Sequence, residues 1–246
     1  MLTHVEDLKF RLMVIELLQA AKRTYTYREL ASKTGLPVTV LSRYAKGHVL
    51  PNNERARQLL KVLNRLVGLE VELQNKIKFN DDGYFNNTEI IGNYNILRQA
   101  ANVALDKFAG RRVTKILTAA VDGIPLATMI SNRLGVDLVI AKRNKEVGVE
   151  SFIEETYVLS NSGVTMTLYI PKNSLRRRDS VLLVDDMIKT GETQMALINL
   201  VRKARAEISG AFFLIAVGND WRRKIRLSAD CPVEIVVQLS SPKSRK

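Results

Sequence analysis

The sequence predicts an α/β protein with two parts, an all-α helix-turn-helix domain followed by an open, mostly parallel sheet with flanking helices. Residues 5–67 contain short helical segments that glycines and prolines separate. From residue 93 onward, apolar strand-like runs alternate with helical segments, which is typical of a parallel sheet. Polar loops follow two of these runs, at the sheet edge where such folds bind ligands. We therefore expect domains at 1–67 and 93–246, joined by a linker or possible hood segment at 68–92.

Length and composition exclude several classes of protein. With 246 residues, the chain is long enough for two domains. It has no run of roughly 18 apolar residues that could span a membrane, and its first residues include acids rather than the apolar stretch of a secretory signal. A single cysteine, Cys231, allows neither an internal disulfide nor a cysteine-based metal cluster. We expect a cytoplasmic protein with no membrane partner and no metal or cofactor of its own.

The charge is strongly positive and unevenly distributed. The chain has 38 lysines and arginines against 25 acidic residues, a net charge of +13. Residues 22–65 contain ten of the basic residues and only two acids, Glu29 and Glu54, which gives this segment a net charge of +8. Such a concentration indicates a polyanionic partner or phosphorylated ligands. The alternative is an ordinary solvated helical face, which charge alone does not distinguish.

The first two elements are helices. Residues 5–23 carry apolar side chains at helical spacing, which predicts an amphipathic helix. These side chains are Leu8, Leu12, Ile15 and Leu18. Thr26 begins the second helix, because Glu29 three residues later completes a capping box. Gly35 ends that helix.

Two more short helices follow. Pro37 opens the third helix, at a position where its missing N–H group costs nothing, and Gly47 closes it. A fourth helix starts after Pro51. Two short helices joined by the tight turn at Gly35 form a helix-turn-helix, in which the later helix lies in the major groove of DNA. A helical interaction domain that never contacts DNA is the alternative.

The segment "ELASKTGLPVTVLSRYAKGHVLP", within about residues 8–67, resembles the lambda-repressor-like (XRE) DNA-binding family. Its small and apolar packing positions match that family at Ala31, Gly35, Val40 and Leu41. The resemblance implies that exposed residues of the third helix contact double-stranded DNA. These residues are Thr39, Ser42, Arg43 and Lys46, with Tyr44 as a phosphate-contacting or base-stacking candidate. For each of them, an ordinary surface position on a basic helix is the alternative.

The segment at 68–92 is expected to be a linker with a short strand or hairpin. Asp81-Asp82-Gly83 is a turn signal within it. These acids do not form a calcium loop, because no further ligands follow at the required spacing.

The second domain begins with a helix at 93–110. Strand and helix patterns then alternate, which predicts an open, mostly parallel sheet. We expect strands at 113–120, 136–142, 180–186, 207–218 and 233–239, helices at 125–135 and 193–206, and a flexible hairpin within 144–170 that turns at Asn161-Ser162-Gly163.

The loop in "VLLVDDMIKTGET", residues 181–193, has the chemistry of a site for a sugar phosphate. Backbone N–H groups in its glycine-containing turn, at the start of a helix, can bind a phosphate monoester. The adjacent carboxylates, Asp185 and Asp186, can accept hydrogen bonds from the 2'- and 3'-hydroxyls of a ribose. The Walker A and G-x-G-x-x-G patterns are absent. The predicted ligand is a ribose 5-phosphate.

The same loop closely resembles the phosphoribosyl pyrophosphate (PRPP) signature of type I phosphoribosyltransferases. The resemblance implies contacts to the PRPP ribose and 5'-phosphate from Asp185, Asp186, Met187, Lys189, Thr190, Gly191, Glu192 and Thr193. A second loop, "LTAAVDGIPLA", resembles the pyrophosphate loop of the same family, and "AKRNK" matches the basic residues that follow its second strand. This implies pyrophosphate contacts from Val121, Asp122, Gly123, Lys142, Arg143 and Lys145, with Mg²⁺ carried by the bound PRPP.

The combination of the two parts resembles the bacterial purine repressors and the archaeal phosphoribosyltransferase-like regulators of the GfcR type. It implies a homodimeric DNA-binding transcriptional regulator whose second domain senses PRPP or a related ribose phosphate or nucleotide. An active orotate- or purine-type phosphoribosyltransferase is the first alternative. Little chain remains after the last strand to form a hood over a nucleobase, although segment 68–92 could supply one. An RNA-binding attenuator that uses the second domain is the other alternative.

Overall fold

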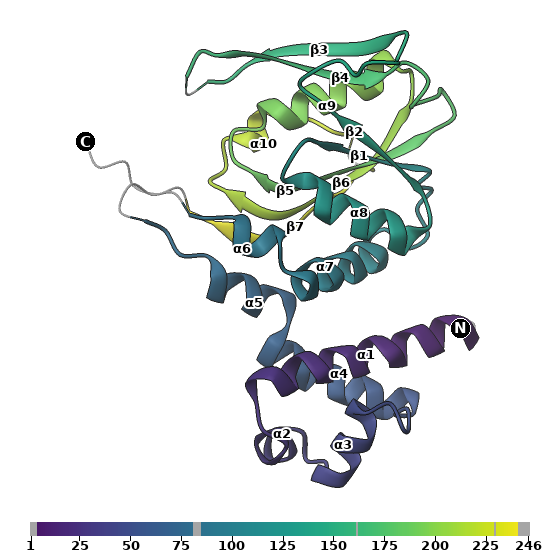
Figure 1. Ribbon diagram of the computed structural model, residues 1–246, viewed down its shortest axis with the longest axis vertical. Coiled ribbons are helices and arrows are strands. Elements are labelled where there is room, and N and C mark those ends of the chain that lie inside the picture. Colours follow the sequence, from purple (N-terminus) through teal and green to yellow (C-terminus); the bar gives the residue numbers. More distant parts are fainter. Residues whose placement is uncertain (1–3, 81–84, 161, 229, 241–246) are drawn as a thin grey trace. The chain divides into compact units, whose positions relative to one another are not determined.

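The computed structural model describes residues 4–80, 85–160, 162–228 and 230–240. The chain divides into two compact units, Met1–Asn75 and Lys76–Lys246, which we call the helical unit and the α/β unit (Figure 1). The first unit therefore extends to Asn75, whereas the sequence predicted a domain that ends at residue 67. The predicted turn residues 81–83 and 161 lie outside the described residues.

The helical unit is built from short helices around one apolar core. Its elements are α1 (His4–Thr24), α2 (Tyr27–Thr34), α3 (Val38–Ala45), α4 (Asn53–Val67) and α5 (Leu69–Lys76), the last of which ends at the unit boundary. The fully buried core side chains include Leu18, Leu30, Leu41 and Leu63. Because α2 and α3 each contribute one leucine to this core, the helix-turn-helix is held together by its inward-facing residues.

The helix boundaries follow the predicted local signals. Glu29 N donates to Thr26 Oγ1 at 3.3 Å, and Thr26 N donates to Glu29 Oε2 at 2.7 Å, which completes the capping box of α2. Gly35 ends α2 with a left-handed φ of 69°. Asn52 caps α4 by accepting a hydrogen bond from Arg55 N at 2.8 Å.

The buried face of α1 differs from the predicted one. Leu8 and Leu12 are 38% and 44% exposed, although Ile15 and Leu18 are buried as expected. At 3.6 residues per turn, Leu8 and Leu12 project from a different face than the one that packs on the other helices. The residues of α1 in the core are Val14, Leu17, Leu18 and Ala21, which have the i, i+3, i+4, i+7 spacing of a single helix face.

The predicted linker is partly helical. Within 68–92 the structure places α5 and a short helix α6 (Thr88–Ile91). Leu69 and Leu73, four residues apart, are buried along α5, so the apolar spacing of a helix was present but short. The expected hairpin is represented by one antiparallel bridge between Phe79 and Phe85, whose rings meet edge to face at 5.4 Å.

The α/β unit has a five-stranded parallel sheet in the order β2-β1-β5-β6-β7, as the fold class predicted. Its elements are α7 (Tyr94–Lys107), β1 (Lys115–Ala119), α8 (Gly123–Leu134), β2 (Asp137–Ala141), β3 (Phe152–Val158), β4 (Thr165–Pro171), β5 (Ser180–Ile188), α9 (Glu192–Lys203), β6 (Glu207–Val217), α10 (Trp221–Lys224) and β7 (Val233–Leu239). Figure 1 shows α7 and α8 on one face of the sheet. On the other face, α9 lies between the sheet and the antiparallel hairpin of β3 and β4.

The sheet opens between β1 and β5. These strands pair from Lys115 opposite Val181 to Leu117 opposite Leu183. Beyond that point β5 continues beside β6 as far as Ile188, and β1 continues beside β2. The strand order also changes direction between β1 and β5, and in parallel sheets such a switch point forms the ligand crevice. Within the described segments, none of the helices combines the length and apolar composition needed to cross a lipid bilayer.

Candidate functional site

Two adjacent carboxylates lie on β5 just beyond its last pairing with β1. Asp185 and Asp186 are each only 6% exposed. Asp185 Oδ2 accepts a hydrogen bond from Gln194 Nε2 at 2.8 Å, and its Oδ1 accepts one from the backbone N–H of Asp186 at 3.2 Å. Gln194 therefore fixes Asp185 from the first turn of α9.

The environment disfavours the charged forms of both aspartates. Burial raises the pKa of Asp185 well above its ordinary value of 3.8, and the neighbouring charge of Asp186 raises it further. Burial also raises the pKa of Asp186, and the negative charge of Asp122 acts in the same direction, against the lowering effect of hydrogen bonds from Asp185 and Asn87. Ligand hydroxyls that donate to these oxygens would stabilise the carboxylates, so the pair suits a ligand with neighbouring hydroxyl groups.

Helix α8 begins directly against Asp185. A Cβ atom on Gly123 would lie 2.4 Å from Asp185 Oδ1 and 2.3 Å from the Oγ1 of buried Thr118. Glycine is therefore required here because it has no Cβ atom, which lets α8 approach Asp185 closely. The backbone angles of Gly123 do not require glycine. This contact places the predicted pyrophosphate loop beside the predicted ribose-binding carboxylate.

A residue of the predicted linker also contacts the site. Asn87 Nδ2 donates a hydrogen bond to Asp186 Oδ2 across 99 positions of sequence. The Oδ1 atom of Asn87 is buried and has no hydrogen-bond partner among the described residues. One residue of the predicted linker therefore contacts the carboxylate pair, and the role of segment 68–92 as a hood stays a prediction.

The predicted phosphate loop forms the turn between β5 and α9. Gly191 has a left-handed φ of 85°, and a Cβ atom there would lie 3.2 Å from Trp221 Cβ, so the turn packs tightly against α10. Met187 is half-buried at the end of β5, and Lys189 is exposed. The remaining hydroxyls and the loop carboxylate have internal partners. The hydroxyl of Thr190 donates a hydrogen bond to the Glu192 carboxylate. The hydroxyl of Thr193 shares a hydrogen bond with the hydroxyl of Tyr157 at 3.3 Å.

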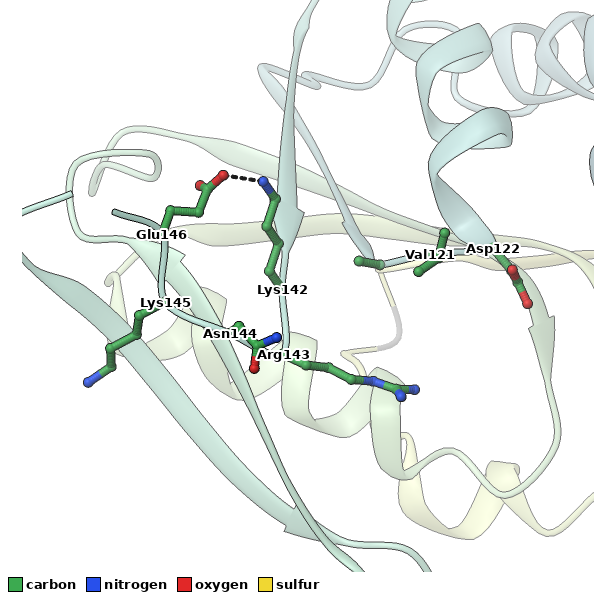
Figure 2. Close-up of a pocket in the computed structure, with 8 residues that line it drawn as sticks. Val121, Asp122, Lys142, Arg143, Asn144, Lys145 and Glu146 are labelled. Carbon is green, nitrogen blue, oxygen red and sulfur yellow. Dashed lines mark hydrogen bonds and ion pairs between the residues drawn. The ribbon is translucent and has the colours of Figure 1, made fainter. Parts of the chain in front are cut away.

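Except for Gly123, the predicted pyrophosphate residues line one hollow of about 470 Å³ (Figure 2). Val121 and Asp122 form one side, and Lys142 and Arg143 contribute to the other. Lys142 forms an ion pair with Glu146. Lys145 also borders the hollow, but its Nζ lies 3.0 Å from Glu154 Oε2 and 5.0 Å from the centre of the Tyr169 ring, so it faces the hairpin. Arg143 has no ion pair among the described residues and is therefore the best placed cation for an anionic ligand.

The predicted DNA-contacting residues occupy the outer side and the carboxyl end of α3. Thr39, Arg43 and Lys46 are exposed, and Ser42 is half-buried. Tyr44 is half-buried and packs against the apolar core of the helical unit, so its ring contributes to the packing of that unit. The end of α3 is fixed because Gln19 Nε2 donates to the carbonyl oxygen of Ala45 at 2.8 Å.

Sequence patterns missed several residues that contact the site. Gln194 directly follows the Thr-Gly-x-Thr turn, and its place in the first turn of α9 could have indicated it. Asn87, Ser160 and Lys224 lie far along the chain from their partners, and no local pattern marks them. Among the described residues, no group of three or more His, Cys, Asp or Glu side chains could hold a metal ion.

The described residues thus form a helix-turn-helix unit and an α/β unit that has a buried aspartate pair and a glycine turn at the edge of its parallel sheet. Comparison with known proteins identifies the parts. Residues 86–242 match the family model of the phosphoribosyl transferase domain, and residues 15–67 match a helix-turn-helix model. The chain belongs to the phosphoribosyl transferase domain family and carries a helix-turn-helix before that domain.

Relatives include regulators and enzymes. The purine biosynthesis transcriptional repressor PurR of Bacillus subtilis is 32% identical over 141 residues, which are 57% of this chain and 50% of that protein. A xanthine phosphoribosyltransferase of Heliobacterium modesticaldum is 32% identical over 121 residues, 49% of this chain and 63% of the enzyme. The chain spans about half the length of the purine regulators it matches.

Solved structures support the same fold. The adenine phosphoribosyltransferase of Rhodothermus marinus superposes with a TM-score of 0.60 at 29% identity, covering 70% of this chain and 98% of the enzyme. The adenine phosphoribosyltransferase of Trypanosoma brucei, solved with AMP, pyrophosphate and ribose 5-phosphate, gives a TM-score of 0.62 at 19% identity, covering 69% of this chain and 79% of that one.

Proposed function

We propose that the protein is a DNA-binding transcriptional regulator whose α/β unit senses PRPP or a related ribose phosphate or nucleotide. The observation that carries this proposal is the presence, on one chain, of a basic helix-turn-helix and a phosphoribosyl transferase domain with its buried aspartate pair. The purine repressor of Bacillus subtilis, which matches over 57% of this chain, supports it. We further propose that the protein acts in the cytoplasm as a homodimer, because helix-turn-helix proteins read two-fold symmetric sites as dimers.

The proposed ligand contacts follow from the geometry of the crevice. Asp185 and Asp186 would accept hydrogen bonds from the ribose hydroxyls. Backbone N–H groups of the turn at Gly191 would bind the 5'-phosphate. Arg143 and the loop at Asp122 would face the diphosphate. Mg²⁺, where present, would arrive with that diphosphate and would neutralise part of its charge.

The contact between Asn87 and Asp186 offers a route from ligand to DNA-binding unit. Asn87 lies on the segment that leads from Asn75 into the α/β unit. A ribose hydroxyl that donates to Asp186 must share this carboxylate with Asn87 or displace the amide. A ligand alters DNA affinity only through a difference in its affinity for two states of the protein. In one such state Asn87 would keep its hydrogen bond to Asp186, and in the other that hydrogen bond would be broken.

DNA binding measured with and without PRPP tests this function directly. A duplex would be selected from a random pool by the full chain, and its affinity would be followed over a salt titration. We expect specific binding that PRPP changes. A double variant, Asp185→Asn with Asp186→Asn, should bind the duplex equally well and should no longer respond to PRPP. The proposal is wrong if no duplex is preferred, or if no ribose phosphate alters the affinity.

Transferase activity is the second candidate, because several relatives are xanthine and adenine phosphoribosyltransferases. In that case segment 68–92, which brings Asn87 to the crevice, would act as the hood over a nucleobase. Incubation with PRPP, Mg²⁺ and a panel of nucleobases, with pyrophosphate release as the readout, distinguishes the two functions. Release that depends on one nucleobase would establish the enzyme.

A further inference from the structure

The predicted phosphate loop contains a carboxylate of its own. Glu192, the first residue of α9, is only 8% exposed. Its Oε2 accepts a hydrogen bond from Thr190 Oγ1. Its Oε1 accepts hydrogen bonds from Ser160 Oγ and from Lys224 Nζ. Two hydroxyl groups and one ammonium group therefore converge on a single buried anion.

These donors come from three separate parts of the α/β unit. Thr190 belongs to the loop, Ser160 to the connection between β3 and β4, and Lys224 to the end of α10. Lys224 Nζ also donates to Ser160 Oγ at 3.0 Å, so the two distant donors are linked to each other. The close packing of Trp221 against Gly191 holds α10 beside the loop. The donor cluster is therefore fixed by tertiary packing and does not arise from the loop alone.

Glu192 is an anion at neutral pH. Burial acts to raise its pKa, but hydrogen bonds from Lys224 and Ser160 outweigh burial and lower the pKa below its ordinary value. The amino end of α9 favours a negative charge at the same place. Hydroxyl and ammonium donors are also the groups that proteins use to bind phosphate oxygens. A phosphate that arrived at this turn would find the Thr190 hydroxyl occupied and a like charge beside it.

We propose that Ser160 and Lys224 are further phosphate-binding residues, and that Glu192 holds them in the ligand-free protein until a 5'-phosphate displaces its carboxylate. The inference rests on the proposed function, because the phosphate belongs to the ribose phosphate that function requires. In the exchange, the hydrogen bonds from Thr190, Ser160 and Lys224 pass from the carboxylate to phosphate oxygens. A ligand without a phosphate group has nothing with which to replace Glu192. The arrangement thereby selects phosphorylated over unphosphorylated sugars.

A double-mutant cycle tests the direct role of Lys224. The probe is ribose 5-phosphate, with ribose as the unphosphorylated comparison, and binding to the full chain is measured by calorimetry. We expect Glu192→Gln to bind ribose 5-phosphate at least about tenfold more tightly, since a nearby like charge is removed. Lys224→Met should weaken binding in the wild type and, by a similar factor, in the Glu192→Gln background. If Lys224 only neutralises Glu192, its replacement has no effect once Glu192 is glutamine, and the proposal is overturned.

Ser160→Ala gives an independent measurement if the variants of the ion pair fold poorly. This change removes one hydroxyl and leaves the charge of Glu192 and Lys224 intact. It should weaken binding of ribose 5-phosphate severalfold and leave the thermal unfolding midpoint near that of the wild type. Unchanged affinity in Ser160→Ala would contradict the assignment of Ser160 to the phosphate subsite.

Glu155→Gln is the matched control for charge. Glu155, on β3, forms an ion pair with Lys203 at 2.6 Å. Lys203 lies at the other end of α9, about 16 Å from Glu192 along the helix axis. This change should leave the affinity for ribose 5-phosphate unchanged. Equal tightening in Glu155→Gln and Glu192→Gln would show a general charge effect and would overturn the proposal. If neither the wild type nor Glu192→Gln binds ribose 5-phosphate or PRPP, the sensing function fails as well. If the wild type responds to PRPP and all variants bind alike, only the present inference fails.

Discussion

Replacement of Gly123 by alanine should damage the ligand crevice by adding a single methyl group. The new Cβ would lie 2.4 Å from Asp185 Oδ1 and 2.3 Å from Thr118 Oγ1. Ordinary van der Waals contact begins at 3.4 Å, so each neighbour must move by about 1 Å. Asp185 has little room to move, because Gln194 holds its other oxygen at 2.8 Å.

Two effects of Gly123→Ala can be given magnitudes. Overpacking of this kind costs about 1–3 kcal/mol of the free energy of unfolding. For a unit of this size, each kcal/mol lowers the unfolding midpoint by about 2–4 °C, which gives a drop of roughly 2–12 °C. A displaced Asp185 also loses one charge-assisted hydrogen bond to the ligand, worth about 1.5–3 kcal/mol. The dissociation constant for PRPP should therefore rise by about tenfold to a hundredfold.

Thermal unfolding with and without PRPP measures both effects in one assay. Gly92→Ala is the matched control, since its new Cβ has a single close neighbour, the carbonyl oxygen of Thr88 at 3.0 Å. We expect the PRPP-dependent rise of the midpoint to survive in Gly92→Ala and to shrink strongly in Gly123→Ala. A Gly123→Ala protein that unfolds and binds PRPP like the wild type would refute the close approach of α8 to Asp185.

Other changes test the carboxylates and the helical unit. Asp186→Asn keeps an amide oxygen for Asn87 but removes a charge, so PRPP binding should weaken about tenfold to a hundredfold, measured by calorimetry. Burial raises the pKa of Asp186 above 3.8, so the stability it contributes is full below that pH and is lost as the pH rises through the raised pKa. In thermal unfolding, the gain in midpoint from Asp186→Asn should therefore be larger at neutral pH than near pH 4, and the reverse trend would contradict the burial argument. Replacing Arg43 or Lys46 by a neutral residue should change the dependence of DNA binding on salt. The slope of the logarithm of the binding constant against the logarithm of the salt concentration should become shallower by about 0.9 for each DNA phosphate that the side chain contacts. An unchanged slope would show that the residue does not contact a DNA phosphate. Leu41→Ala should cost about 2–5 kcal/mol and abolish DNA binding while PRPP still binds, which calorimetry on the same sample would show.

The features that the sequence predicted well depend on neighbouring residues. The capping box at Thr26 and the left-handed Gly35 need only a few residues to form, and both are present. Strand and helix alternation from residue 93 onward predicted the parallel sheet, because each strand reads as a continuous apolar run. The loop after β5 was located in the same way, since its carboxylates, glycine and threonines lie close together in the sequence, and its role in ligand binding stays a prediction.

The features that were missed depend on packing between distant segments. Whether Leu8 and Leu12 are buried is decided by which face of α1 meets the other helices, and periodicity alone allows both faces. The short helix α5 carries only two buried leucines, too few for a clear helical pattern. Asn87 resembles an ordinary turn residue until the fold places its amide on Asp186.

The polar groups that a ribose phosphate would use have internal partners in the chain itself. Asp186 accepts from Asn87, and Thr190 donates to Glu192. This pairing is expected on physical grounds, because a buried polar group without a partner costs about 1–3 kcal/mol. A ribose phosphate bound as proposed would therefore share these groups with their internal partners or replace those partners. One of these partners, Asn87, lies in the first part of the α/β unit, on the segment that follows Asn75, so the proposed binding of a ribose phosphate would also act on that segment.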